Sequence, residues 1–176
     1  MRDRFGPELD RAAAHHHGDV KAAERELKTR VRRFGKLNLR ALAPTEREQY
    51  VTQWTDLQAK FVESPGVAVA QANRLLSHLA AELGYPADSH ARQVEALSVR
   101  HPGRVDGMRQ LHLAAQRAAE GGGTVEEMRQ AFVAGRLLFE ELLVTYSQDE
   151  GADKSVARHL ERVPQQRSID RTRSLG

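Results

Sequence analysis

Histidines and paired glutamates are the residues of this chain whose types could support metal binding or acid–base chemistry. Three histidines are adjacent at 15–17, and glutamates are paired at 126–127 and at 140–141. Neighbouring residues on a helix point about 100° apart, so neither the histidine run nor a glutamate pair converges on one metal ion or one substrate. No two histidines lie four residues apart and no Glu-x-x-His motif occurs, so the spacings of zinc proteases and of di-iron bundles are absent.

Other catalytic signatures are also missing. The chain contains no cysteine, which excludes thiolate nucleophiles, disulfides and cysteine zinc sites and fits a reducing compartment. The glycine run 121–123 lacks the Lys-Ser/Thr pair of a phosphate-binding loop, and no Gly-x-Ser-x-Gly elbow is present. We therefore expect no catalytic residue, no metal site and no cofactor, and we expect that the protein is not an enzyme.

Positive charge is concentrated in one segment. Residues 19–43 contain eight basic and three acidic side chains, whereas residues 44–143 contain ten basic and thirteen acidic ones. Clustered cations attract nucleic acid phosphates, lipid surfaces and acidic proteins. The candidate anionic-partner site comprises Arg25, Lys28, Arg32, Arg33, Lys36 and Arg40. The alternative is a solvated helix face, and base stacking has little support because Phe34 is the only aromatic residue of the segment.

A helix is expected to carry most of these cations. Asp19 can cap its start and Gly35 can end it. Glu24 and Lys28, and Glu26 and Arg30, lie four residues apart, which allows two ion pairs along the helix. The alternation of apolar and polar residues over 36–42 predicts an extended connector that packs its leucines against the core.

The stretch 45–146 predicts helices that bury one another. Its first helix carries four apolar residues at steps of four, three and four, which places them on one face. They are Tyr50, Trp54, Leu57 and Phe61. Thr45 and Glu48 have the spacing of a capping box at its start. We interpret the stripe as a core face; the alternative is a small-ligand pocket around Trp54, His112 and Phe132.

Further helices are delimited by proline, glycine and capping residues. One begins at Pro65 and ends at Gly84, a short one is capped by Asp88, and another covers about 104–120.

A last helix ends near Tyr146. Thr124 and Glu127 form a second capping box at its start. Gly135 lies on its apolar face, where the missing side chain would let a second helix approach closely.

Both ends of the chain are expected to be flexible. Residues 1–18 are polar and alanine-rich, and residues 147–176 have little apolar periodicity. No apolar run is long enough to cross a bilayer, and no signal-peptide apolar region follows the first residues. These features predict a soluble, cytoplasmic protein without a transmembrane segment.

Several short stretches together resemble a known family. They are QAKFVESP at 58–65, GYP at 84–86, LSVRHP at 97–102, and MRQAFV and LFEELL within 128–143. Over about residues 39–143 the chain resembles a family of small helical proteins common in high-GC actinobacteria. Its members are largely described as uncharacterised or secreted, so the resemblance implies a helical domain and a bacterial source but no activity. The family pattern has an aspartate before its first proline and before His-Pro, where this chain has Glu63–Ser64 and Arg100.

These features predict an all-α protein: a compact four- to five-helix bundle with a basic N-terminal helix and a flexible C-terminal tail. The expected division is a flexible N-terminus at 1–18, a basic helix and connector at 19–43, a bundle at 44–146 and a mostly disordered tail at 147–176. The leading hypothesis is a non-enzymatic protein-interaction or scaffold module. The alternative is nucleic-acid or anionic-surface binding through residues 21–40. The partner and the oligomeric state are left open.

Overall fold

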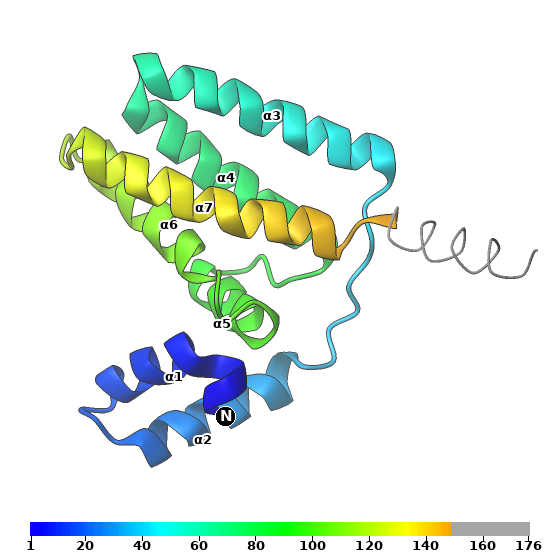
Figure 1. Ribbon diagram of the computed structural model, residues 1–176, viewed down its shortest axis with the longest axis vertical. Helices are drawn as coiled ribbons and strands as arrows, with labels where there is room; N and C mark the ends of the chain where they lie inside the picture. Colours follow the sequence, from blue (N-terminus) through cyan, green and yellow to red (C-terminus); the bar gives the residue numbers. More distant parts are fainter. Residues whose placement is uncertain (149–176) are drawn as a thin grey trace, which may run out of the picture.

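The computed structural model in Figure 1 describes residues 1–148. This part of the chain contains seven α-helices joined by short connectors. In chain order they are α1 (Arg2–His15), α2 (Val20–Phe34), α3 (Pro44–Glu63), α4 (Pro65–Leu83), α5 (His90–Arg100), α6 (Asp106–Ala119) and α7 (Val125–Thr145). The prediction of an all-α protein is confirmed. The predicted bundle of four to five helices behind one basic helix amounts to at most six helices. This total is wrong, because a seventh helix, α1, forms in a segment expected to be flexible.

Four long helices, α3, α4, α6 and α7, form the main body, and α5 lies near one end of them (Figure 1). α4 packs against α3, α6 and α7, and α6 packs against α7. Trp54 stacks on Phe139 in the core, with ring centroids 4.6 Å apart. Tyr50, Trp54 and Leu57 are buried and Phe61 is partly buried, so the predicted apolar face of α3 is confirmed.

α1 and α2 form a hairpin that lies beyond α5 (Figure 1) and has a small hydrophobic core of its own. Its buried residues are Phe5, Leu9, Ala12, Ala23 and Leu27. The expectation that residues 1–18 are flexible is wrong for this reason: the first three of these residues, at steps of four and three, share one face of α1 that α2 covers. Three apolar positions among alanines and charges gave a weak sequence signal, and the matching face lies on another helix.

Two glycines bring α6 and α7 into close contact. A Cβ atom at Gly135 would overlap the Cδ1 atom of Leu111, and one at Gly107 would overlap the backbone carbonyl of Ala134. The predicted close approach at Gly135 is therefore confirmed, and Gly107 on the facing helix serves the same purpose.

Two predicted helix caps are confirmed. The Asp19 carboxylate accepts a hydrogen bond from the backbone N–H of Ala22 at 3.0 Å. Thr124 and Glu127 form a reciprocal capping box with distances of 3.1 and 3.2 Å. Each cap satisfies backbone donors that a helix start leaves unpaired.

Two other predicted helix starts are wrong, one by two residues and one by a single residue. Ala43, rather than Thr45, is the N-cap of α3, and the Glu46 carboxylate accepts a hydrogen bond from the backbone N–H of Ala43 at 3.4 Å. Ser89, rather than Asp88, caps α5. In both places, a neighbouring side chain, Glu46 or Ser89, accepts the hydrogen bond at the helix start in place of the predicted one.

The connector after α2 packs against the body as predicted. Leu42 is fully buried, and Leu37 and Leu39 are partly buried against the main core. The Leu42 backbone N–H donates to the carbonyl of Tyr146 at 2.6 Å, and the Gln148 N–H donates to the carbonyl of Leu42 at 3.2 Å. Residues 147 and 148 are thus held by this bridge, and the remainder of the expected tail, 149–176, lies outside the described residues.

Within residues 1–148, no helix combines the length and the apolar character that crossing a bilayer requires.

Candidate anionic-partner interface

α2 exposes a row of cations to solvent. Lys21, Arg25, Lys28 and Arg32 follow one another at steps of four, three and four, which confines them to an arc of about 60° on a regular helix. All four are exposed. No ion pair joins any of them to an acidic side chain of residues 1–148. These four residues are the α2 stripe.

Three of the six predicted site residues belong to this stripe: Arg25, Lys28 and Arg32. Lys36 is exposed beyond the end of α2. Arg33 points elsewhere, with its Nη1 atom 3.6 Å from Oε2 of Glu95 on α5. Lys21 was not among the predicted site residues, although its spacing relative to Arg25 could have identified it.

Arg40, the sixth predicted residue, is engaged within the fold. Its Nη2 atom lies 2.8 Å from the Glu46 carboxylate and 2.6 Å from the Glu82 carboxylate. The hydrogen bond with Glu46 raises the pKa of Arg40 and lowers that of Glu46. Arg40 therefore fastens the connector to α3 and α4, and the structure does not bring it together with the stripe.

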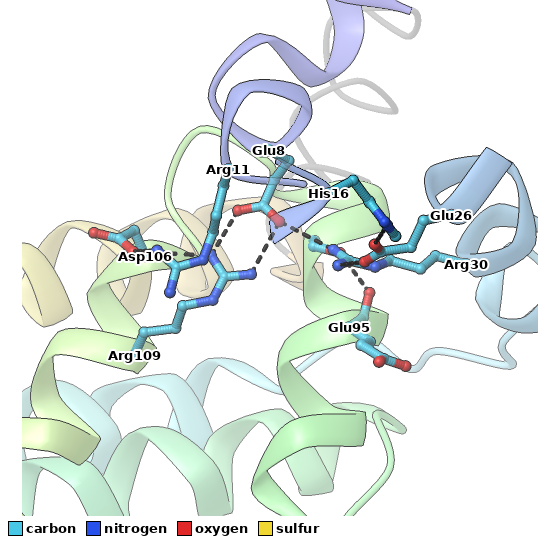
Figure 2. A network of polar contacts seen from close by, with 9 residues as sticks. Glu8, Arg11, His16, Glu26, Arg30, Glu95, Asp106 and Arg109 are labelled. Carbon is cyan, nitrogen blue, oxygen red and sulfur yellow. Dashed lines mark hydrogen bonds and ion pairs between the residues drawn. The ribbon is translucent and has the colours of Figure 1, made fainter. Parts of the chain in front are cut away.

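A buried ion network on the other side of α2 fixes the orientation of the hairpin. Figure 2 shows Glu8 of α1 between Arg30 of α2 and Arg109 of α6. Arg109 donates two hydrogen bonds to the Glu8 carboxylate, at 2.6 and 2.9 Å, and Arg30 donates one at 3.1 Å. Glu8 is only 2% exposed. No local spacing in the sequence connects Glu8 with Arg30 or Arg109, which lie 22 and 101 residues away. The network holds the opposite face of α2 against the body, so the α2 stripe stays exposed.

Glu26 and His16 extend the network within the hairpin (Figure 2). Arg30 also donates to Glu26, and His16 Nε2 lies 2.8 Å from Glu26 Oε2. Burial alone would raise the pKa of Glu26, but the hydrogen bond with His16 and the charge of Arg30 outweigh it and lower the pKa. Glu8 and Glu26 are thus paired with inward-facing side chains rather than with the stripe. Glu24, which also lies on α2, forms no ion pair with Lys28 or with any other cation of residues 1–148, so the predicted Glu24–Lys28 pair is not formed.

A polar cleft of about 540 Å³ opens beside the network, between the hairpin and α5 and α6. Its wall includes His15, His16 and His90, and His90 stacks on His112 with ring centroids 3.7 Å apart. Burial, followed by the charges of His112 and Arg109, lowers the pKa of His90 to about 4. Among residues 1–148, no group of three or more histidine, aspartate or glutamate side chains is arranged to hold a metal ion.

The alternative hypothesis of a small-ligand pocket around Trp54, His112 and Phe132 is wrong. Trp54 and Phe132 stack on each other in the core with ring centroids 4.9 Å apart, and both are buried. His112 instead stacks on His90, so the structure does not bring the three together. The aromatic stripe of α3 is a core face.

A second buried polar cluster lies where α7 ends. The hydroxyl groups of Tyr85 and Tyr146 are 2.5 Å apart, and Nε2 of His101 lies 3.0 Å from the Tyr146 hydroxyl. Burial lowers the pKa of His101, although Glu141 at 3.4 Å opposes that shift. The cluster ties the turns after α4 and α5 to the end of α7, so it has a structural role.

Comparisons with protein-family models, curated proteins and solved structures return no match. The family resemblance noted in the sequence stays a prediction, and a function for this chain has to be argued from its own geometry.

Proposed function

We propose that this protein is a non-enzymatic interaction module that binds an acidic segment of a partner protein along the α2 stripe. The observation that supports this is the row of four exposed cations with no acidic partner among residues 1–148. A cytoplasmic location, expected from the sequence, is part of the proposal.

The stripe carries an energetic cost that a partner can offset. Lys21 with Arg25 and Lys28 with Arg32 are like-charge pairs four residues apart, and Glu24, three residues after Lys21 and four before Lys28, offsets only part of their repulsion. Each such pair destabilises an isolated helix by about 0.2–0.5 kcal/mol. Many other arginines of residues 1–148 are paired with acids, as at Arg30 and Arg109. Carboxylates of a partner placed along the stripe would remove the repulsion and gain favourable charge contacts.

An acidic protein segment fits this surface better than a long nucleic acid. Residues 44–143 carry more acidic than basic side chains, so a long polyanion would leave the stripe and meet like charge. Phe34, the only aromatic residue of the basic segment, is buried and cannot stack on bases. A short acidic segment can remain on α2.

Nucleic acid binding is the second candidate, because the stripe is straight. Eleven residues separate Lys21 from Arg32, which corresponds to about 16 Å along a helix. A line of cations of that length can contact successive phosphates of one strand.

The test is a titration of the full-length protein with a fluorescently labelled glutamate–serine peptide, at low and at physiological ionic strength, followed by fluorescence anisotropy. We expect saturable binding that weakens with salt. The variant Lys21→Gln/Arg25→Gln should bind about twofold to thirtyfold more weakly, because it loses two exposed ion pairs worth roughly 0.2–1 kcal/mol each.

The matched control is Lys60→Gln/Arg74→Gln, which removes the same residue types from exposed positions of α3 and α4. Its affinity should equal that of the wild type. Equal losses in both variants, or no binding at low ionic strength, would refute the proposal. Tighter binding of duplex DNA that only the α2 variant loses would favour the second candidate instead.

A further inference from the structure

A groove of about 450 Å³ lies beside the C-terminal half of the α2 stripe. Its wall is formed by Met1, Arg4, Phe5, Lys28, Val31 and Arg32. The groove lies where α1 is kinked: Phe5 leaves the helical conformation (φ −120°, ψ 18°), two residues before Pro7. Two members of the stripe, Lys28 and Arg32, therefore also form the edge of this groove.

The floor and the edge of the groove differ in chemistry. The floor is apolar: the Phe5 ring is buried in the core of the hairpin, and Val31 packs against both hydrophobic cores. The edge is cationic. Arg4 lies over the Phe5 ring, 4.8 Å from its centroid, and Lys28 and Arg32 are exposed. None of the residues that line the groove is acidic.

We propose that this groove receives one apolar side chain of the acidic partner segment, whose carboxylates lie on the surrounding cations. This inference rests on the proposed function and specifies its partner: an acidic peptide with a single apolar anchor. An apolar side chain of the peptide would cover the exposed part of the floor. Acidic residues on either side of it would contact Arg4, Lys28 and Arg32. The shape of the groove and its charge therefore favour the same kind of peptide.

The spacing within the peptide follows from the helix. Arg25 lies six residues before Val31, which corresponds to about 9 Å along α2. An extended peptide covers that distance in about three residues. Acidic residues about three positions from the apolar anchor would therefore reach Arg25, while the anchor occupies the groove.

A lipid surface fits the same chemistry less well. Insertion into a membrane requires apolar side chains that project beyond the cations. Here the apolar atoms of Phe5 and Val31 form the floor of a concave site between cationic side chains. A concave apolar site accepts a side chain and does not insert one.

The test compares two labelled peptides of equal charge that bind the full-length protein. Both carry glutamates three positions from a central residue, which is leucine in one peptide and serine in the other. We expect the leucine peptide to bind about tenfold more tightly, as for partial burial of one leucine side chain. The substitution Val31→Thr, which keeps the shape of the side chain, should reduce this preference severalfold and leave the affinity for the serine peptide unchanged.

A second measurement does not depend on a substitution in the hairpin core. A peptide with a photoreactive leucine analogue at the anchor position should cross-link to Phe5, Val31 or Met1, as read by mass spectrometry. Cross-links confined to the α3–α7 body would overturn the inference.

The failures are distinguishable. Equal affinities of the two peptides, both weakened to the same extent in Lys21→Gln/Arg25→Gln, would refute the groove inference and leave the proposed function standing. Absence of binding by both would refute the proposed function as well. Binding of anionic phosphatidylserine vesicles without binding of either peptide would replace the peptide ligand by a membrane surface.

Discussion

Glu8 is the residue on which the orientation of the hairpin depends most. Its carboxylate is buried and accepts three hydrogen bonds from two arginines on different helices (Figure 2). Buried ion pairs contribute little net stability relative to apolar residues, but loss of one partner leaves the others buried and unpaired. We therefore expect that replacing Glu8 lowers the free energy of unfolding.

The substitution Glu8→Gln should lower the free energy of unfolding by up to about 3–5 kcal/mol, because Arg109 then keeps only the longer contact with Asp106, at 3.8 Å, and Arg30 keeps only Glu26. Urea denaturation measures this change. The control is Glu140→Gln, which breaks the exposed pair with Arg136 and should cost less than about 1 kcal/mol. Similar midpoints for the two variants would contradict the assignment of Glu8 as the centre of the network.

The protein should become less stable as the pH is lowered, because histidines gain protons more readily in the unfolded chain than in the folded protein. The folded pKa of His90 is about 4, whereas an unperturbed histidine has a pKa of about 6.5. Between these values the unfolded chain binds more protons, so the free energy of unfolding decreases as pH falls from about 6.5 towards 4. Burial lowers the pKa of His101 as well, and it acts in the same direction.

The variant His90→Gln should show a smaller decrease in thermal midpoint between about pH 6.5 and 5, a range in which carboxylates remain ionised. Glu26 and Glu46, whose pKa values are lowered, contribute only at lower pH. Substitution of the exposed His78 provides the control. A slope that is unchanged by His90→Gln would show that this imidazole titrates normally in the folded protein.

At the scale of elements, the crossing of α6 and α7 is the tightest helix contact of the body. Gly107 and Gly135 allow it, since a side chain at either position would overlap the facing helix. The backbone of Ala134 limits Gly107, whereas the Leu111 side chain limits Gly135. Backbone atoms have less freedom to move away, so Gly107 is the stricter position.

Gly107→Ala should therefore destabilise the protein by about 1–3 kcal/mol or more, the range for overpacking a core. The matched control is Gly103→Ala, where no heavy atom lies within 4 Å of the added carbon. That substitution should leave stability nearly unchanged or raise it by up to about 1 kcal/mol, because alanine restricts the unfolded chain. A calorimetric scan of both variants decides the matter, and equal melting temperatures would contradict the close crossing.

The elements that sequence patterns predicted correctly have local causes. Asp19, Thr124 and the Trp54 face each depend on residues within about four positions of one another, a range that caps and helical periodicity cover. Contacts between distant residues were not accessible in this way. Glu8 and Arg109 are 101 residues apart in sequence, and no periodicity connects them.

The candidate site shows the same division. The cationic segment was evident from composition, and Arg25, Lys28 and Arg32 lie on the stripe as its helical spacing requires. Arg33 and Arg40 are diverted to Glu95 and Glu82, which lie on helices far along the chain. Tertiary packing decides which cations remain unpaired, so composition alone could not separate Arg33 and Arg40 from the stripe.

At the scale of the whole molecule, the described residues form two parts that differ in charge: the α3–α7 body and the α1–α2 hairpin. The α3–α7 body holds the main hydrophobic core and carries a slight acidic excess over residues 44–143. The α1–α2 hairpin has its own small core, and the ion network in Figure 2 attaches it with the basic face of α2 outward. This arrangement presents a local cationic surface on an otherwise mildly acidic protein, the geometry expected of a site for a short acidic segment.

The measurement that tests this account most directly is a nuclear magnetic resonance titration of the full-length protein with the acidic leucine peptide. We predict that amide shift changes concentrate on the outer face of α2, at Lys21, Arg25, Lys28 and Arg32, and at Val31 and Phe5. Shift changes centred on the histidine cleft around His90 or on the α3–α7 body, or no changes at all, would contradict the claim that the α2 stripe is the binding surface.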